Sequence, residues 1–169
     1  MLFRSNVQQI GVNNNTNVNI VGSGTAAASS VTGNQNNVTI TCGNDSGSCD
    51  NSTLHANVSG DNNTAFINST INSTSAIDIT GGGNHATINN SSTNMLGASA
   101  AITINGDTNT VGVTQDGVAG TNGHQATVTV TGGMNNVSVM QGGTVDSNVS
   151  VSTNGTGRSE EHTSELQSH

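Results

Sequence analysis

Two cysteines are the residues of this chain with the clearest chemical potential. Cys42 and Cys49 flank a short segment of Gly, Asn, Asp and Ser. In a secreted protein such a pair can close its loop as a disulfide, and we expect this bond; two free thiols are the alternative. Without a nearby pair of histidines they do not complete the four ligands of a zinc site. The expected chemistry is a structural cross-link.

Histidines and aspartates are too scattered to predict a catalytic or metal site. His55, His85 and His124 lie 30 and 39 residues apart, and no Ser-His-Asp or Cys-His pairing follows from this spacing. Asp45 and Asp50 lie in one polar loop, but their spacing matches neither an EF-hand loop nor the glycine-rich calcium repeat. We therefore expect no metal, no cofactor and no enzymatic activity.

The two ends of the chain differ from the rest in composition. Residues 1–5 and 158–169 resemble conceptual translations of short-read sequencing adapters, and we interpret them as artefacts; an unusual natural tail is the alternative. The segment 6–157 is then the natural part, which we expect to come from a longer gene. Both basic residues, Arg4 and Arg158, and all three glutamates lie in the ends.

The charge of segment 6–157 excludes several classes of partner. Its only charges at neutral pH are seven aspartates, with no Lys, Arg or Glu. A chain without cations cannot neutralise phosphates, so nucleic-acid binding is excluded, and basic adhesion to an anionic membrane fails for the same reason. No apolar run approaches the ~20 residues that span a bilayer, so we expect no membrane insertion.

A recurring unit organises the segment. The pattern Val/Ile-x-Gly-x-x-Asn-x-Val/Ala-x-Ile/Val fits five times, with its glycines 27, 21, 25 and 26 residues apart. Each copy has a glycine, an asparagine three residues later and a small or branched apolar residue after two more. These positions are Gly33, Asn36, Val38; Gly60, Asn63, Ala65; Gly81, Asn84, Ala86; Gly106, Asn109, Val111; and Gly132, Asn135, Val137. A sixth, degenerate copy opens the segment with Gly11 and Asn14.

Residues alternate with a period of two within each unit, which predicts β-strands. A second alternating run precedes each glycine, as in Ala126, Val128 and Val130. Each unit is therefore expected to be strand, Gly-x-x turn, strand and variable loop, with Asp61 and Asp107 serving the turns. One unit cannot bury its apolar face alone, so the sequence predicts an all-β solenoid of stacked strand-turn-strand repeats at ~4.8 Å per rung. An asparagine repeated at one inward position predicts a hydrogen-bonded ladder.

These residues resemble the curlin repeats of curli fibre subunits, whose pattern is approximately Gln-x-Gly-x-x-Asn-x-Ala-x-x-x-Gln. Residues 9–14 match its first half, and the copies that end at Gln115 and Gln141 match its second half. Five copies depart from the pattern, because they carry Val or Ile where the family has its first Gln. Three copies replace the terminal Gln, by Cys42, Ser69 and Asn90. Val and Ile also suit a β-core.

The resemblance implies a structural protein that is secreted and works outside the cell or at its surface. It implies self-association into amyloid-like fibres of a biofilm matrix, with a nucleator or a secretion apparatus as further partners. Open strand edges at the ends of a stack, which can template another chain, are the physical route to such a fibre.

Three alternatives remain at this point. The first is a non-polymerising solenoid segment of a large surface adhesin or a phage fibre. The second is an ice- or glycan-binding module on a flat sheet face, but the outward Thr pair at residues 39 and 41 is replaced by Phe66 and Asn68 in the next unit, so the row is broken. The third is disorder, which the repeat argues against.

Overall fold

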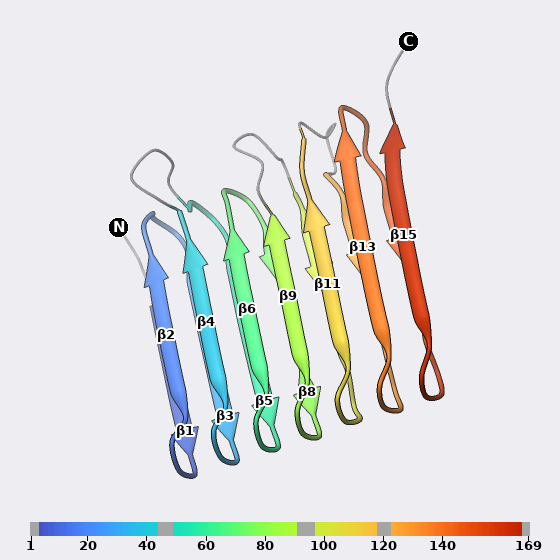
Figure 1. Cartoon of the computed structure of the whole chain (residues 1–169). Helices are drawn as coiled ribbons and strands as arrows, with labels where there is room; N and C mark the ends of the chain where they lie inside the picture. Colours follow the sequence, from blue (N-terminus) through green and yellow to red (C-terminus); the bar gives the residue numbers. More distant parts are fainter. Residues whose placement is uncertain (1–3, 44–48, 91–96, 118–122, 167–169) are drawn as a thin grey trace.

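Two parallel β-sheets face each other in the computed structural model of the chain, which describes residues 4–43, 49–90, 97–117 and 123–166 (Figure 1). The chain alternates between the sheets and forms a β-solenoid of about six turns. The described residues contain strands and no helix, as the period of two predicted. Accordingly, no described segment is a helix long and apolar enough to cross a membrane.

The first sheet, called sheet A, contains eight strands among the described residues. They are β1 (Arg4–Ile10), β3 (Ala26–Thr32), β5 (Thr53–Ser59), β7 (Thr74–Ser75), β8 (Ile79–Thr80), β10 (Ser99–Ala101), β12 (Gln125–Thr127) and β14 (Asn148–Ser150). The second sheet, sheet B, contains seven. They are β2 (Asn15–Ile20), β4 (Asn37–Cys42), β6 (Thr64–Ser69), β9 (His85–Asn90), β11 (Thr110–Gln115), β13 (Asn136–Gly143) and β15 (Ser159–Leu166).

Equivalent positions of the repeat lie side by side in sheet B. Val38 is paired with Ala65, Ala65 with Ala86, and Val111 with both Ala86 and Val137. The repeat lengths differ by several residues, yet this register stays in step because the variable loops between units absorb the difference. The sequence repeat is therefore the structural rung.

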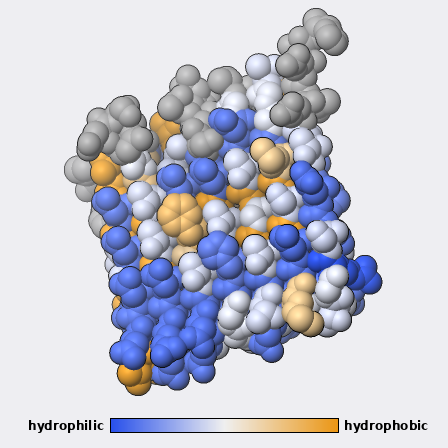
Figure 2. Space-filling model, viewed as in Figure 1, coloured by the Kyte–Doolittle hydropathy of each residue, from blue (hydrophilic) through white to orange (hydrophobic). Residues whose placement is uncertain are grey.

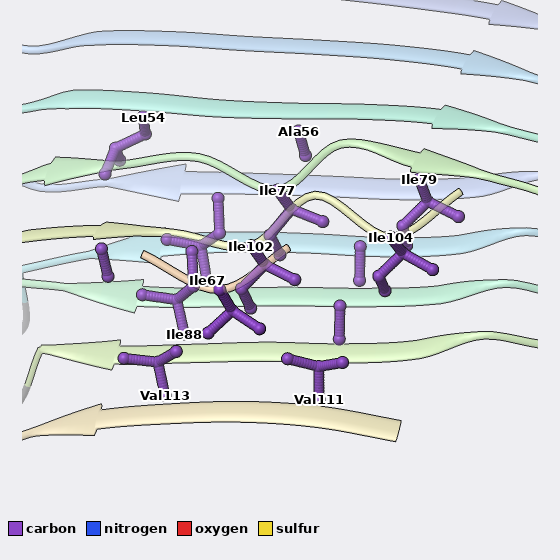
Figure 3. Close-up of a cluster of buried hydrophobic side chains, with 14 of the residues drawn as sticks. Leu54, Ala56, Ile67, Ile77, Ile79, Ile88, Ile102, Ile104, Val111 and Val113 are labelled. Carbon is purple, nitrogen blue, oxygen red and sulfur yellow. The ribbon is translucent and has the colours of Figure 1, made fainter. Parts of the chain in front are cut away.

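Apolar side chains of different size fill the core between the two sheets. In the fourth rung, Ile88 of β9 is buried together with Ile79 of β8 and with Ile77, which precedes β8 (Figure 3). Ala86, the smaller residue of β9, is buried in the same rung. Branched side chains fill both sheets in the next rung. Since burial of one such side chain contributes about 1.5–3 kcal/mol, the core is built from many small increments along the stack.

Close contact between rungs explains the repeat glycines better than backbone conformation alone. A Cβ on Gly60 would lie 1.9 Å from the carbonyl oxygen of Gly81, which no side chain tolerates. Gly60 also has a φ of 117°, as expected for a turn glycine, but Gly106 has no positive φ of this kind and still would place its Cβ 1.9 Å from the oxygen of Gly132. The same steric limit applies at Gly33, Gly81 and Gly132.

Sheet A is less regular than the alternating pattern predicted. Ile102, Ile104 and Val128 are buried as expected, but they lie outside the strands. Thr103 and Thr131 adopt φ values of 79° and 75°, which interrupt the extended backbone. Backbone bonds still join the rungs there, because the Thr131 N–H donates to the Ile104 carbonyl at 3.0 Å. The same side chains therefore point into the core as predicted, although the strand is interrupted between them.

The two expected adapter segments lie at opposite ends of the stack where they are described. Residues 4 and 5 belong to β1, and most of residues 158–166 belong to β15, which pairs with β13. Backbone pairing of this kind accepts almost any sequence at an open sheet edge. The assignment of residues 1–5 and 158–169 as artefacts stays a prediction.

We predict that Gly60→Ala destabilises the chain by at least about 2–3 kcal/mol, because its Cβ forces two rungs apart. Gly112→Ala is the matched control, because a Cβ at Gly112 meets nothing within 4 Å, and it should change stability by less than about 1 kcal/mol. Urea unfolding followed by circular dichroism measures both. Equal effects of the two substitutions would contradict the steric explanation.

Candidate assembly site

A column of asparagines runs along the edge of the core next to the repeat turns. Asn36, Asn63 and Asn84 are its central members, each about 1% exposed. Each Nδ2 donates to the Oδ1 of the asparagine in the preceding rung, at 3.1 Å in all three cases. The complete column, called the Asn ladder, consists of Asn14, Asn36, Asn63, Asn84, Asn109 and Asn135.

Each buried amide of the ladder satisfies its hydrogen-bonding groups through neighbouring rungs. The Oδ1 of Asn63 accepts both the backbone N–H and the Nδ2 of Asn84, at 2.9 and 3.1 Å. The Nδ2 of Asn63 also donates to the carbonyl of Gly81 in the following rung at 2.8 Å. An unpaired buried amide would cost about 1–3 kcal/mol, so the column holds successive rungs in one register.

A second polar column closes the other side of the core. Gln115 Nε2 donates to Gln141 Oε1 at 2.8 Å, and Asn90 Nδ2 donates to Gln115 Oε1. Ser69 lies one rung earlier and donates to Asn90 Oδ1 at 3.3 Å. These side chains are nearly fully buried. In this column the amide N–H groups donate to the side chain of the following rung. In the Asn ladder they donate to the asparagine of the preceding rung. The side-chain dipoles of the two columns therefore point in opposite directions.

Cys42 continues this second column below Ser69, with which it is paired in register. It forms a disulfide with Cys49, and both residues are fully buried. Thr25 donates to the carbonyl of Cys49, which connects the cross-linked loop to the preceding rung. At this end of the second polar column, the position held by an amide or a hydroxyl in other rungs is therefore a disulfide-bonded cysteine. Asp45, in the loop between the two cysteines, lies outside the described residues.

Aspartates of the turns bond to the neighbouring rung rather than to their own turn. Asp61 Oδ1 accepts the backbone N–H of Asn34 at 2.6 Å, and Asp107 Oδ1 accepts that of Gly82 at 2.7 Å. The equivalent position is glycine in the rungs of Gly82 and Gly133, so carboxylates occur on alternate rungs here. The turn aspartates therefore act by hydrogen-bonding to the neighbouring rung. Because they occur on alternate rungs, their carboxylates are about 9.6 Å apart instead of 4.8 Å, which reduces their repulsion.

His124 is a buried polar residue that the sequence patterns left unplaced. Its Nδ1 lies 2.8 Å from Ser147 Oγ, which also accepts a bond from Gln141 Nε2 at 3.1 Å. Burial lowers the pKa of His124 from its ordinary value of 6.5, against the backbone hydrogen bond with Asp116 and the charges of Asp146 and Asp116. His124 therefore extends the second polar column as a neutral imidazole.

His55 and His85 lie on the surface of the stack. His85 is exposed, and His55 Nε2 lies 3.3 Å from Asp78 Oδ1 with both side chains about half exposed. Within the described ranges, no three His, Cys, Asp or Glu side chains converge on a possible metal position. The convergent groups of this molecule are the two columns, so the candidate site is one for stacking.

The outward row that suggested ice binding is interrupted in the structure too. Thr39 is paired with Phe66, and Thr41 with Asn68, in the adjacent strand. Farther along, the same row contains Gly112 and Ser138. A regular Thr-x-Thr surface is therefore absent from the outward positions of β4 to β13.

Comparisons with protein-family models, with curated proteins and with solved structures find no match.

We predict that Asn36→Asp destabilises the chain by at least about 3 kcal/mol at pH 7. The Asn36 Nδ2 donates to the Asn14 Oδ1 and to the Gly60 carbonyl, and a carboxylate has no N–H to replace it. A buried carboxylate oxygen would instead face the Asn14 oxygen without a hydrogen bond. Asn37→Asp is the control on the adjacent residue, because Asn37 is exposed and its oxygen remains an acceptor. It should shift stability by about 0.5 kcal/mol or less in chemical unfolding. A mild effect of Asn36→Asp would contradict the ladder as a stabilising element.

We also predict that stability falls as the pH drops below about 6.5. Folding lowers the pKa of His124, so below pH 6.5 the unfolded chain binds a proton at this residue while the folded chain does not. The free energy of unfolding is therefore unaffected by His124 above pH 6.5 and decreases as the pH falls from 6.5 toward the lowered pKa of the folded state. His124→Gln should remove this part of the pH dependence between pH 7 and 5, whereas exchange of the exposed His85 for Gln should retain it. Urea midpoints across this range provide the measurement.

Proposed function

We propose that the chain is a structural subunit of a self-assembling extracellular fibre that is similar to curli. The observation that supports this proposal best is the Asn ladder, in which rung after rung repeats the same donors and acceptors. At one end of the ladder the Asn135 Oδ1 accepts the Arg158 N–H at 3.1 Å, so without residues 158–169 it would be open to the next rung. At the other end the Asn14 Nδ2 donates to the Ile10 carbonyl at 3.2 Å in place of a preceding asparagine. A second copy can therefore continue the column by a head-to-tail contact, which forms a filament because it does not close.

The two columns also favour an in-register addition. An added rung that slipped by one residue would place Val or Ile opposite the amides and leave the amides unpaired. The correct register satisfies both columns at once. The proposed role is structural rather than enzymatic, with matrix formation or adhesion as its use.

The Cys42–Cys49 disulfide supports secretion, since such bonds persist mainly in oxidising compartments. The proposal includes a secretion apparatus that exports the chain and a nucleator that starts assembly at the cell surface. Slow, non-local strand pairing makes a nucleator useful, because the first rungs must close before stacking contacts accumulate.

Fibre formation by the purified full chain and by segment 6–157 tests this function. Assembly should give a cross-β diffraction pattern with the ~4.8 Å reflection along the fibre axis and binding of an amyloid dye. Preformed fibres should remove the lag phase. Asn37→Asp should form fibres at the parent's rate, whereas Asn36→Asp should form them at least about tenfold more slowly, because it disrupts the ladder that holds the rungs of each subunit in register.

A chain that stays monomeric at high concentration and binds no dye would overturn the proposal. A folded, soluble monomer in that experiment would favour the alternative of a non-polymerising segment in a larger adhesin or phage fibre.

A further inference from the structure

The outward face of sheet B is uncharged between β4 and β13. Its fifteen outward positions, all described, hold Asn, Thr and Ser with four exceptions, and His85 is the single titratable residue among them. They are Asn37, Thr39, Thr41, Thr64, Phe66, Asn68, His85, Thr87, Asn89, Thr110, Gly112, Thr114, Asn136, Ser138 and Met140. We call this set the sheet B face; in Figure 2 its side of the molecule is mostly polar with isolated apolar groups.

The described aspartates of segment 6–157 lie elsewhere. Asp61 and Asp107 are in the turns, and Asp78 is on sheet A. The others lie in the loops at the opposite edge, namely Asp50, Asp116 and Asp146. Because the segment has no cation to neutralise them, surfaces with carboxylates repel a second copy. The sheet B face is where two copies can approach without that repulsion.

One row of this face has a protrusion and a hollow. Phe66, the single aromatic residue of segment 6–157, is paired with Thr87, and Thr87 is paired with Gly112. A Cβ at Gly112 would meet nothing within 4 Å, so its place on the face is open. Ring and hollow are thus two rungs apart, about 9.6 Å, with Thr87 midway.

This arrangement is self-complementary under a two-fold rotation. An axis parallel to the strands at the level of β9 keeps the row and reverses the order of the rungs. It brings Phe66 of each copy over Gly112 of the other, sets Thr87 opposite Thr87, and sets Thr39 opposite Ser138. An isologous contact of this kind uses the same surface on both partners.

We propose that the sheet B face is a lateral interface between two antiparallel copies of this chain, with Phe66 of each copy inserted over Gly112 of the other. The inference goes beyond the proposed function, which concerns stacking along the solenoid axis. Asn and Thr rows on the two faces can exchange hydrogen bonds, which offsets the loss of water from polar side chains.

The area of the face indicates how strong this contact is. Five rungs at ~4.8 Å and three outward residues along each strand give about 500 Å² per copy, or about 1,000 Å² in total. This is near the lower limit of specific interfaces, so two isolated subunits pair weakly. In a stack each added subunit extends the same face, and lateral pairing strengthens by multivalency.

Cross-linking of single-cysteine variants of the full chain tests the two-fold. A short bis-maleimide linker reacts with a new thiol and leaves the Cys42–Cys49 disulfide intact. Thr87→Cys should give covalent dimers at least about tenfold faster than Ser138→Cys, because only Thr87 faces itself. Thr39→Cys and Ser138→Cys should each cross-link poorly alone and well when mixed. Equal rates for all variants, or no dimers from Thr87→Cys, would overturn the inference.

Fibre width distinguishes lateral pairing from stacking. Phe66→Thr and Gly112→Val remove the protrusion and fill the hollow, and both should convert paired filaments into single ones at an unchanged rate of fibre formation. Thr127→Val, on the outward face of sheet A, is the control and should keep the pairs. Paired filaments from both variants would contradict the interface. Absence of fibres from the parent chain would overturn the proposed function alone, since the cross-linking assay does not require fibres.

Discussion

Hydrogen bonds between amides of successive rungs are the constraint on which this structure depends. A thin core that carries an asparagine on every rung must pair each amide with its equivalent above and below, since water does not reach it. The bonds of Asn63 to both Asn36 and Asn84 show how little freedom remains. Rung spacing, register and parallel strand direction follow from this requirement together with the backbone pairing.

The glycines are the steric counterpart of that constraint. Rungs held at the spacing of a parallel sheet leave no room for a Cβ where the turns stack, as at Gly60 against Gly81. The turn aspartates then add bonds between rungs and keep their charges on alternate rungs. Order in the core and order in the turns are therefore two results of the same stacking distance.

Departures from the repeat are concentrated on one side of the core. The second polar column tolerates Ser69, Asn90 and Gln115 because hydroxyl and amide groups of different length can reach across one rung. At the base of this column stands Cys42, which forms a disulfide with Cys49 in place of a side-chain hydrogen bond. The Asn ladder tolerates no such variation in the five regular copies, since its amides also bond the glycine carbonyls at fixed distances. Uneven repeat length is confined to the connections that lead from a strand of sheet B to the next strand of sheet A.

Sequence periodicity determined most of this molecule: the inward and outward residues, the turns, the stacked β class and the position of the Asn ladder. This was possible because the side chains of a strand alternate every two residues and the unit occurs five times, so the sequence shows five times which residue types each position accepts. The interruptions at Thr103 and Thr131, the steric role of Gly106, and the burial of His124 against Ser147 were decided by the tertiary structure. These depend on how one rung meets the next and on loops of unequal length, and no pattern within a single unit encodes such contacts.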